Sequence, residues 1–243
     1  MPVLFEEMTR EQIKAIAPNA IAVMPTAATE QHGPHMAVGT DTLLVSTVAA
    51  RAAESAADSV PVVVTPPLAF GSSHHHIPFG GTLSLTSDTF IDVVREVTVG
   101  LVKTGFCKIA ILNGHGGNVK PMMRRIDEYK DKLGINLRFQ SYWDVYDPAL
   151  VQQHMEHGRL PGHADEFETS TMLYLAPERV QAEAIDNESA ALGTREKGEA
   201  LVGPAVDGVA GLLRQMIAGE DINLPTVTFY PEGKRDLVSG DPI

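Results

Sequence analysis

Glu30, His32 and Asp41 are the residues of this chain whose types and spacing most directly suggest chemistry. In an extended backbone, residues i and i+2 point to the same side, so Glu30 and His32 can present a carboxylate and an imidazole to one point. The glycines and proline that follow can turn the chain back and bring Asp41 to that point as well. Two carboxylates and an imidazole suit a hard-to-borderline divalent cation, and an ordinary hydrogen-bonded loop is the alternative interpretation.

A second polar loop, with the sequence Asn-Gly-His-Gly-Gly-Asn at 113–118, places His115 in a tight turn. Its glycines allow left-handed or crowded backbone conformations, which would hold the imidazole above the end of the preceding strand. Asn113 and Asn118 are expected to pin this turn. The spacing does not match the dinucleotide-binding fingerprint, and a glycine-rich phosphate cradle is the alternative. We predict that His115 is catalytic or bound to a metal.

The segment 163–168, with the sequence His-Ala-Asp-Glu-Phe-Glu, is the third cluster and opens a predicted helix. Asp165 and Glu166 fit the ordinary preference of acidic residues for the first turn, where they face the positive end of the helix dipole. Glu168 lies between Phe167 and an apolar segment, so we expect its side chain to point inward. A buried carboxylate needs a cation or several donors, which makes Glu168 a further candidate ligand.

The elements that must position these clusters are short apolar strands that alternate with helices. Strands are predicted at 20–25, 60–65, 108–112 and 136–142, and helices at 41–57, 87–104, 118–133, 148–157 and 166–176. Thr9 should start a short first helix through a capping box, and Ser87 should cap the helix at 87–104. The alternation predicts parallel strands with helices on both faces, in which ligands bind beyond the carboxyl ends of the strands. The loops that carry the histidines lie at that edge.

Composition limits the partners and the compartment. The chain has 243 residues, 44% apolar and 21% charged, which suits a single globular domain over 1–243. Its net charge of −12, without any Lys/Arg cluster, argues against nucleic acid and membrane surfaces as partners. No apolar run approaches the ~20 residues of a membrane span, and the acidic first ten residues do not resemble a signal sequence. The single cysteine, Cys107, is expected to be a buried core residue in a reducing cytoplasm.

Taken together, the polar segments resemble the creatininase family of amidohydrolases. The matching segments are Thr-Glu-Gln-His-Gly-Pro-His at 29–35 with Gly-Thr-Asp at 39–41, the run at 113–118, His-Ala at 163–164 with Glu-Thr-Ser at 168–170, and, more weakly, the loop at 76–82. They occur in order over roughly residues 20–176. The resemblance implies an α/β fold of three α-β-α layers around a mostly parallel sheet.

The resemblance also implies two divalent cations in each subunit. One would be held by Glu30, Asp41 and His115, and the other by His32, Asp41 and Glu168, with Asp41 as the bridge. Zinc is the expected metal, while manganese and iron stay open because mixed imidazole and carboxylate ligands accept all three. Members of the family form ring-like hexamers, so we expect a homo-oligomer that acts on a small molecule.

One departure from the family bears on the substrate. Creatininase has a glutamate ligand where this chain has Gly117, so that ligand must come from elsewhere, with Glu168 as the candidate, and creatinine is disfavoured as substrate. Relatives with two glycines here include formamide hydrolases, peptide-clipping enzymes and hydrolases of oxidised inositols. We expect hydrolysis of a C–N bond in a small cyclic or amide substrate. The alternatives are hydrolysis of a C–C bond in a cyclic diketone derived from inositol or a sugar, and a non-catalytic protein that binds a metal or ligand.

The expected chemistry assigns catalytic roles to two residues. Two divalent ions about 3.5–4 Å apart can share a water and lower its pKa from about 15.7 toward neutrality, which supplies hydroxide for attack on a carbonyl. His163 is the predicted general acid, because an imidazole titrates near neutral pH. Glu168 is assigned to the catalytic centre as well as to the metal. The alternative for His163 is a supporting hydrogen bond to Glu168 or to the helix start.

Substrate contacts are predicted for His76, Trp143, Gly116 and Gly117. His76 belongs to the loop that matches the family weakly. His74 and His75 are expected in solvent or at a subunit contact, because adjacent side chains in extended backbone alternate and cannot all reach one ion. Trp143 follows the fourth strand and can line the pocket, with packing beneath the sheet edge as the alternative.

Overall fold

Four parallel strands form the centre of the fold, in the order β2-β1-β3-β4. The structure, a computed structural model, describes residues 4–219. The strands span Ile21–Thr26 (β1), Val62–Val64 (β2), Lys108–Asn113 (β3) and Asn136–Ser141 (β4). β1 and β3 pair from Ile21 beside Lys108 to Thr26 beside Asn113. Their carboxyl ends are therefore level, and the loops that follow them start from the same edge.

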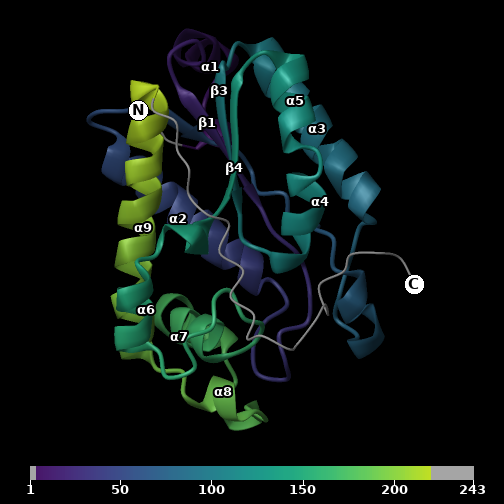
Figure 1. The fold of residues 1–243 in the computed structure, drawn as a ribbon, viewed down its shortest axis with the longest axis vertical. Helices are drawn as coiled ribbons and strands as arrows, with labels where there is room; N and C mark the ends of the chain where they lie inside the picture. The colour runs from purple at the N-terminus through teal and green to yellow at the C-terminus, as the bar shows by residue number, and fades with distance from the viewer. Residues whose placement is uncertain (1–3, 220–243) are drawn as a thin grey trace.

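Helices cover both faces of the sheet, as Figure 1 shows. They span Arg10–Ile16 (α1), Thr40–Ala56 (α2), Ser87–Thr104 (α3), Val119–Met123 (α4), Ile126–Leu133 (α5), Pro148–His154 (α6), Glu166–Leu175 (α7), Glu188–Ala191 (α8) and Arg195–Ala218 (α9). Val23 and Leu112 face the core that includes residues of α2, α7 and α9, whereas Met24 and Ile111 face the core that includes residues of α3, α4 and α5. Successive side chains of a strand thus pack into the cores on opposite faces of the sheet. The predicted three-layer α-β-α architecture is confirmed.

None of the helices within 4–219 combines the length and apolarity that a membrane span requires. The helix boundaries follow local signals in the sequence. Thr9 forms the expected capping box with Gln12, which starts α1. Thr86, rather than the predicted Ser87, caps α3 by accepting a hydrogen bond from the Thr89 N–H. The helix ends at Gly105, whose φ of +115° is readily adopted only by glycine.

Several predicted elements differ from those in the structure. The single helix expected at 118–133 is two helices, because Arg125 leaves the helical conformation with a φ of −125° between α4 and α5. α6 ends at His154, three residues before the predicted end, where Met155 is extended. The strand predicted at 60–65 contracts to β2, and Tyr142 begins a short 3-10 helix instead of ending β4.

Cys107 is exposed, which contradicts its prediction as a core residue. The apolar neighbourhood that suggested burial is real, since Phe106 and Ile109 are fully buried. Phe106 takes the inward position just before β3, so the next side chain points to the opposite side. An apolar stretch in the sequence therefore does not mean that every one of its side chains is buried.

Residues beyond 177, which the sequence left without a role, include the long helix α9. It packs along α2 and α7 on one face of the sheet (Figure 1). Lys197 of α9 donates hydrogen bonds to the fully buried Glu166 at 2.6 Å and to Glu156 at 3.1 Å. Glu166 also accepts hydrogen bonds from the backbone N–H groups of Glu156 and His157. The Glu166 carboxylate thus connects the start of α7 to α9 and to the loop after α6. The prediction had given it only a favourable place in the first turn of a helix.

Replacing Lys197 with methionine should destabilise the protein by about 3 kcal/mol, because it keeps the aliphatic stem but leaves the buried Glu166 without its cation. Burial raises the pKa of Glu166, but the hydrogen bond from Lys197 and those from the backbone lower it overall. A carboxylate with a depressed pKa stabilises the fold above its unfolded pKa and loses that contribution as the pH falls. The difference in the free energy of unfolding between wild type and variant should therefore become smaller in acid. Urea titrations at several pH values measure this difference.

Lys14→Met is the matched control, because Lys14 is exposed and lies 4.0 Å from Glu11. Its effect should stay within about 0.5 kcal/mol. A Lys197→Met protein as stable as this control would mean that Glu166 does not depend on the ion pair.

Candidate metal centre

The structure brings the five predicted ligands together at the carboxyl edge of the sheet. Two come from the loop after β1, one from the first turn of α2, one from the loop after β3 and one from the first turn of α7: Glu30, His32, Asp41, His115 and Glu168. All five are buried, none being more than 7% exposed. Their atoms form two groups of three whose members lie within 4.8 Å of one another, and Asp41 belongs to both groups.

The first group is Glu30, Asp41 and His115. His115 Nδ1 lies 3.3 Å from Glu30 Oε1 and 3.1 Å from Asp41 Oδ2. The other ring nitrogen of His115, Nε2, donates a hydrogen bond to the backbone carbonyl of Ser72 at 3.1 Å. Because that carbonyl can only accept, it fixes the proton on Nε2 and leaves Nδ1 available to face the carboxylates.

The second group is His32, Asp41 and Glu168. His32 Nε2 lies 3.1 Å from Asp41 Oδ1 and 3.6 Å from Glu168 Oε2. His32 Nδ1 donates to the backbone carbonyl of Glu30 at 3.0 Å, which again leaves the second nitrogen facing the carboxylates. Glu168 Oε2 also accepts the Ala164 N–H at 2.6 Å. Asp41 therefore directs one carboxylate oxygen toward each histidine.

The charges of the cluster are strongly coupled. Burial would raise the pKa of Glu30, but the imidazole of His115 outweighs it and holds the pKa of this carboxyl well below its usual range. The pKa of Asp41 is lowered too, against the effect of burial, chiefly by His32. Burial would lower the pKa values of His32 and His115, yet the facing carboxylates raise both. Such a site holds carboxylates in their charged form and demands positive charge at its centre.

The residues fit a divalent metal on two further grounds. His32 Nε2 and Asp41 Oδ2 are buried and make no hydrogen bond within residues 4–219, although opposite groups lie close to each. Buried polar atoms normally find partners, so atoms that converge without hydrogen bonds need another explanation. Mixed imidazole nitrogen and carboxylate oxygen is a donor set that zinc and manganese accept. A bound cation would satisfy these atoms.

The turn that carries His115 is held as predicted. Asn113 Nδ2 donates to the His115 carbonyl at 2.8 Å, and the His115 N–H donates to Asn113 Oδ1 at 3.2 Å. Asn118 Oδ1 accepts the Ser72 N–H at 2.9 Å, and its Nδ2 donates to the Ala27 carbonyl at 3.2 Å. The two asparagines therefore connect the loops after β1, β2 and β3. Their predicted structural role is confirmed.

Gly117 lies where no side chain fits. A Cβ at this position would come within 2.2 Å of the Ser72 carbonyl and 2.5 Å of His115 Nε2. Those are the two atoms of the hydrogen bond that sets the His115 tautomer. The absence of a side chain at Gly117 therefore permits the hydrogen bond that supports His115, a predicted ligand, which is a more specific role than the predicted substrate contact. Gly116 has more space, since its nearest neighbour would be Pro161 at 3.9 Å.

Gly117→Ala should weaken metal binding by about 10- to 100-fold, the usual effect of disturbing a residue that supports a ligand. The added methyl group must push Ser72 or His115 away. Gly211→Ala on α9 is the control, because a Cβ there meets nothing within 4 Å and alanine favours the helix. Competition with a fluorescent chelator measures the affinity. Equal metal affinity in the two variants would contradict the proposed support.

His163, the predicted general acid, lies beside both groups. Its Nδ1 is 3.4 Å from Glu30 Oε1, and its ring is 4.7 Å from that of His32 and 4.0 Å from that of His76. The side chain is 31% exposed, so it can reach both the buried cluster and a molecule arriving from solvent. Its Nε2 faces the amide of Gln31 at 3.0 Å instead of the predicted alternative partners.

The prediction for the histidines at 74–76 requires a correction. They lie in a 3-10 helix, His74–Phe79, and not in the extended backbone on which their prediction rested. His75 and His76 therefore both approach Glu30, and His75 stacks on His115 with ring centroids 6.2 Å apart, so it is not simply solvated, while a subunit contact stays a prediction. Burial, and then the nearby His163, lower the pKa of His76 to about 3, so this ring is neutral. His74 contacts Ser84 at 2.9 Å.

Two residues near the site escaped the sequence analysis. Ser73 donates a hydrogen bond to Glu30 Oε2. Gln31 lies between two predicted ligands, and the alternation of an extended strand directed its side chain away from them. The tight turn around Gly33, whose φ is +64°, returns it to the site. Only the position of Gln31 within the polar run could have suggested its involvement.

Trp143 is packed in the core rather than on an open wall of the site. It is 3% exposed and contacts Tyr142 edge-on, with ring centroids 5.2 Å apart. Its predicted contact with substrate finds no support in this position.

Asp165 caps α7 by accepting a hydrogen bond from the Phe167 N–H. Burial together with the charge of Glu168 raises the pKa of Asp165 to about 7.

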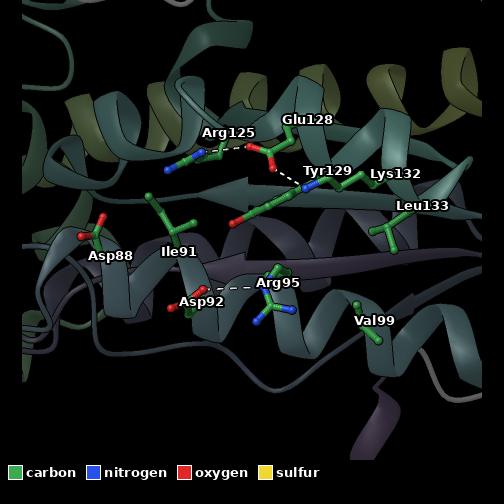
Figure 2. A pocket seen from close by; sticks show the side chains of 10 residues that line it. All are labelled: Asp88, Ile91, Asp92, Arg95, Val99, Arg125, Glu128, Tyr129, Lys132 and Leu133. Carbon is green, nitrogen blue, oxygen red and sulfur yellow. Dashed lines mark hydrogen bonds and ion pairs between the residues drawn. The ribbon is translucent and has the colours of Figure 1, made fainter.

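A groove of about 610 Å³ lies elsewhere, between α3 and α5. Figure 2 shows that its walls carry ion pairs, from Arg125 and Lys132 to Glu128 and from Arg95 to Asp92. None of the predicted site residues lines it. Five of the six charged side chains that line it pair with one another, so the histidine cluster, and not this groove, is the candidate site.

The comparisons with known proteins agree with this geometry. The family model described as creatinine amidohydrolase matches residues 6–215. This chain belongs to the creatininase family. The match extends past the segments at 20–176 and includes most of α9. The relatives of this creatininase-family protein identify it as a hydrolase, and its cluster of carboxylates and imidazoles fits the metals that appear among them.

Three relatives illustrate the range of the creatininase family. The creatinine amidohydrolase of Pseudomonas putida is 29% identical over 86% of this chain and 95% of the relative. The 3-dehydro-scyllo-inosose hydrolase of Thermotoga maritima is 33% identical over 76% of this chain and 60% of the relative. A solved mutant creatininase of Zn-Zn type superposes with a TM-score of 0.79 at 29% identity, over 89% of this chain and 99% of its own.

Proposed function

We propose that this protein is an amidohydrolase that uses two divalent cations to hydrolyse a C–N bond in a small cyclic or amide substrate. The observation that carries the proposal is the position of Asp41. Its Oδ2 lies 3.1 Å from His115 Nδ1, and its Oδ1 lies 3.1 Å from His32 Nε2. Glu30 completes one side and Glu168 the other. The Zn-Zn creatininase among the relatives supports zinc as the metal.

The cations, when bound, would supply a water of lowered pKa and a Lewis acid for the substrate carbonyl. The residues of the chain hold the reacting groups in place. As the water oxygen bonds to the carbonyl carbon, one water proton passes to His163, a partly exposed imidazole beside Glu30 and His32. The C–N bond then breaks, and His163 returns this proton to the leaving nitrogen as general acid. Buried Glu168 faces His32 in the second group and anchors the loop at Ala164 by accepting its backbone N–H.

Hydrolysis of a C–C bond in a cyclic diketone is the second candidate. It is favoured by the 33% identity to the inosose hydrolase, although this chain spans 60% of that relative. The same cluster would serve, since the attack on a carbonyl is unchanged and only the leaving atom differs. His163 would then protonate a carbon of enolate character in place of a nitrogen.

Elemental analysis of the protein as isolated is the first test of this proposal, and about two ions per chain are expected. A screen of cyclic amides, formamides and cyclic 1,3-diketones follows, with the identified metal restored. Turnover of an amide supports the first candidate, and turnover of a diketone supports the second. Bound metal without hydrolysis in any class would favour a binding protein, and a protein that binds no divalent cation would overturn both candidates.

A further inference from the structure

The Gln31 side chain makes three contacts at the mouth of the site. Its Nε2 lies 2.8 Å from His76 Nδ1 and 3.0 Å from His163 Nε2. Its Oε1 accepts the backbone N–H of Gly33 at 2.9 Å. The amide is thus held on one side by the backbone and meets two imidazoles on the other. Neither the metal groups nor the proton transfer discussed above uses this residue.

The orientation of the Gln31 amide is determined by Gly33. A backbone N–H can only donate, so it must face the oxygen of the amide and not its NH₂ group. The NH₂ group then faces both imidazoles, and each of its two hydrogens has one ring nitrogen as partner. Rotating the amide by half a turn would place two donors against each other at Gly33.

This arrangement decides which nitrogen of each ring carries the proton. An NH₂ group requires acceptors, so His163 Nε2 and His76 Nδ1 must both present lone pairs. In a neutral imidazole the other nitrogen then carries the hydrogen. For His163 that nitrogen is Nδ1, 3.4 Å from Glu30 Oε1, and for His76 it is Nε2, 3.9 Å from the same oxygen.

We propose that Gln31 is a positioning residue that fixes the tautomers of His163 and His76, so that both rings direct an N–H group toward Glu30. The two rings stack with centroids 4.0 Å apart and an interplanar angle of 21°, which limits their rotation and preserves the arrangement. The tautomers themselves stand on the contacts in the structure. They do not depend on the proposed function.

The test is a long-range ¹⁵N–¹H NMR correlation on zinc-loaded protein labelled with ¹⁵N-histidine, in which protonated and unprotonated ring nitrogens give distinct signals. His163→Asn and His76→Asn proteins assign the signals by loss. Gln31→Glu is the decisive variant, because it has nearly the same shape and one oxygen can still accept the Gly33 N–H. Its other oxygen accepts where the NH₂ group donated, so His163 Nε2 and His76 Nδ1 should become protonated.

Gln12→Glu, which adds the same charge at the exposed capping box of α1, is the control and should leave both rings unchanged. Gln31→Met removes the donor without adding an acceptor, and should give a mixture of tautomers even if the glutamate variant folds poorly. Wild-type protein with a proton on His163 Nε2, or a folded Gln31→Glu protein with wild-type tautomers, would overturn the proposal. The spectra need no substrate, so failure of the proposed hydrolysis would be seen separately, in the turnover screen.

Discussion

Replacing Asp41 with alanine should remove both cations and reduce hydrolysis to the level of the background reaction. Asp41 is the one side chain shared by the two groups of ligands, with an oxygen 3.1 Å from a nitrogen of each histidine. Its loss would leave each proposed cation with two protein ligands and would take one of three carboxylates from a buried centre. Because the neighbouring imidazoles would then face less negative charge, they should also lose part of the effect that raises their pKa values.

Metal content per chain, measured by mass spectrometry after dialysis, is the primary readout for Asp41→Ala, and turnover of the substrate found by screening is the second. Asp58→Ala is the control, because Asp58 is exposed beyond the far end of α2. Asp41→Asn, which keeps the size and one oxygen, should retain part of the metal. An Asp41→Ala protein that keeps two ions per chain would refute the assignment of this residue as the bridge.

Replacing His163 with asparagine should slow hydrolysis by roughly 10²- to 10⁴-fold while the metal content stays near that of wild type. The ring lies beside the ligand groups and is 31% exposed, as expected of a group that exchanges protons with substrate. Asparagine keeps a polar side chain and cannot deliver a proton at neutral pH. The loss should therefore appear mainly in kcat, because the proton is needed in the transition state rather than for substrate binding.

The same variant separates two roles for His163. Its atoms also lie within 4.8 Å of those of Glu30 and His32, close enough to share an ion. Loss of one equivalent of metal from His163→Asn would identify the imidazole as a ligand. An unchanged kcat with full metal content would mean that His163 only packs against its neighbours. His154→Asn, on α6 and outside the ligand groups, is the control and should behave as wild type in both assays.

The sequence predicted candidate ligands that the structure brings together, and for Glu30, His32 and His115 their positions follow from strong local rules. Glu30 and His32 share a side of an extended segment, and His115 follows a strand in register with β1. The apolar runs that alternate with helical segments predicted the layers, and the edge at which the loops meet followed from parallel topology. Asp41 and Glu168 were candidates from their own segments, but their places in two groups came from the family resemblance, since no local rule shows that a helix start at residue 40 and another at residue 166 converge.

The residues that the sequence analysis misplaced depend on the backbone between elements. His75 reaches the site only because residues 74–79 form a 3-10 helix, which the run of three histidines does not predict. Gln31 points inward because of the turn at Gly33, against the alternation of its neighbours. No residue type at 124–125 marks the break between α4 and α5, and Cys107 depends on which way one side chain turns before β3.

The packing around Gly117 has a consequence for how such enzymes diverge. The resemblance implies that creatininase has a glutamate ligand where this chain has Gly117, yet the Ser72 carbonyl lies 2.2 Å from the first atom that any side chain at this position would add. A single codon change therefore cannot carry a lineage from one ligand set to the other. We therefore expect that the backbone near Ser72 must move away before a carboxylate side chain is tolerated at position 117. The order of substitutions, and not their number alone, would determine which intermediates remain functional.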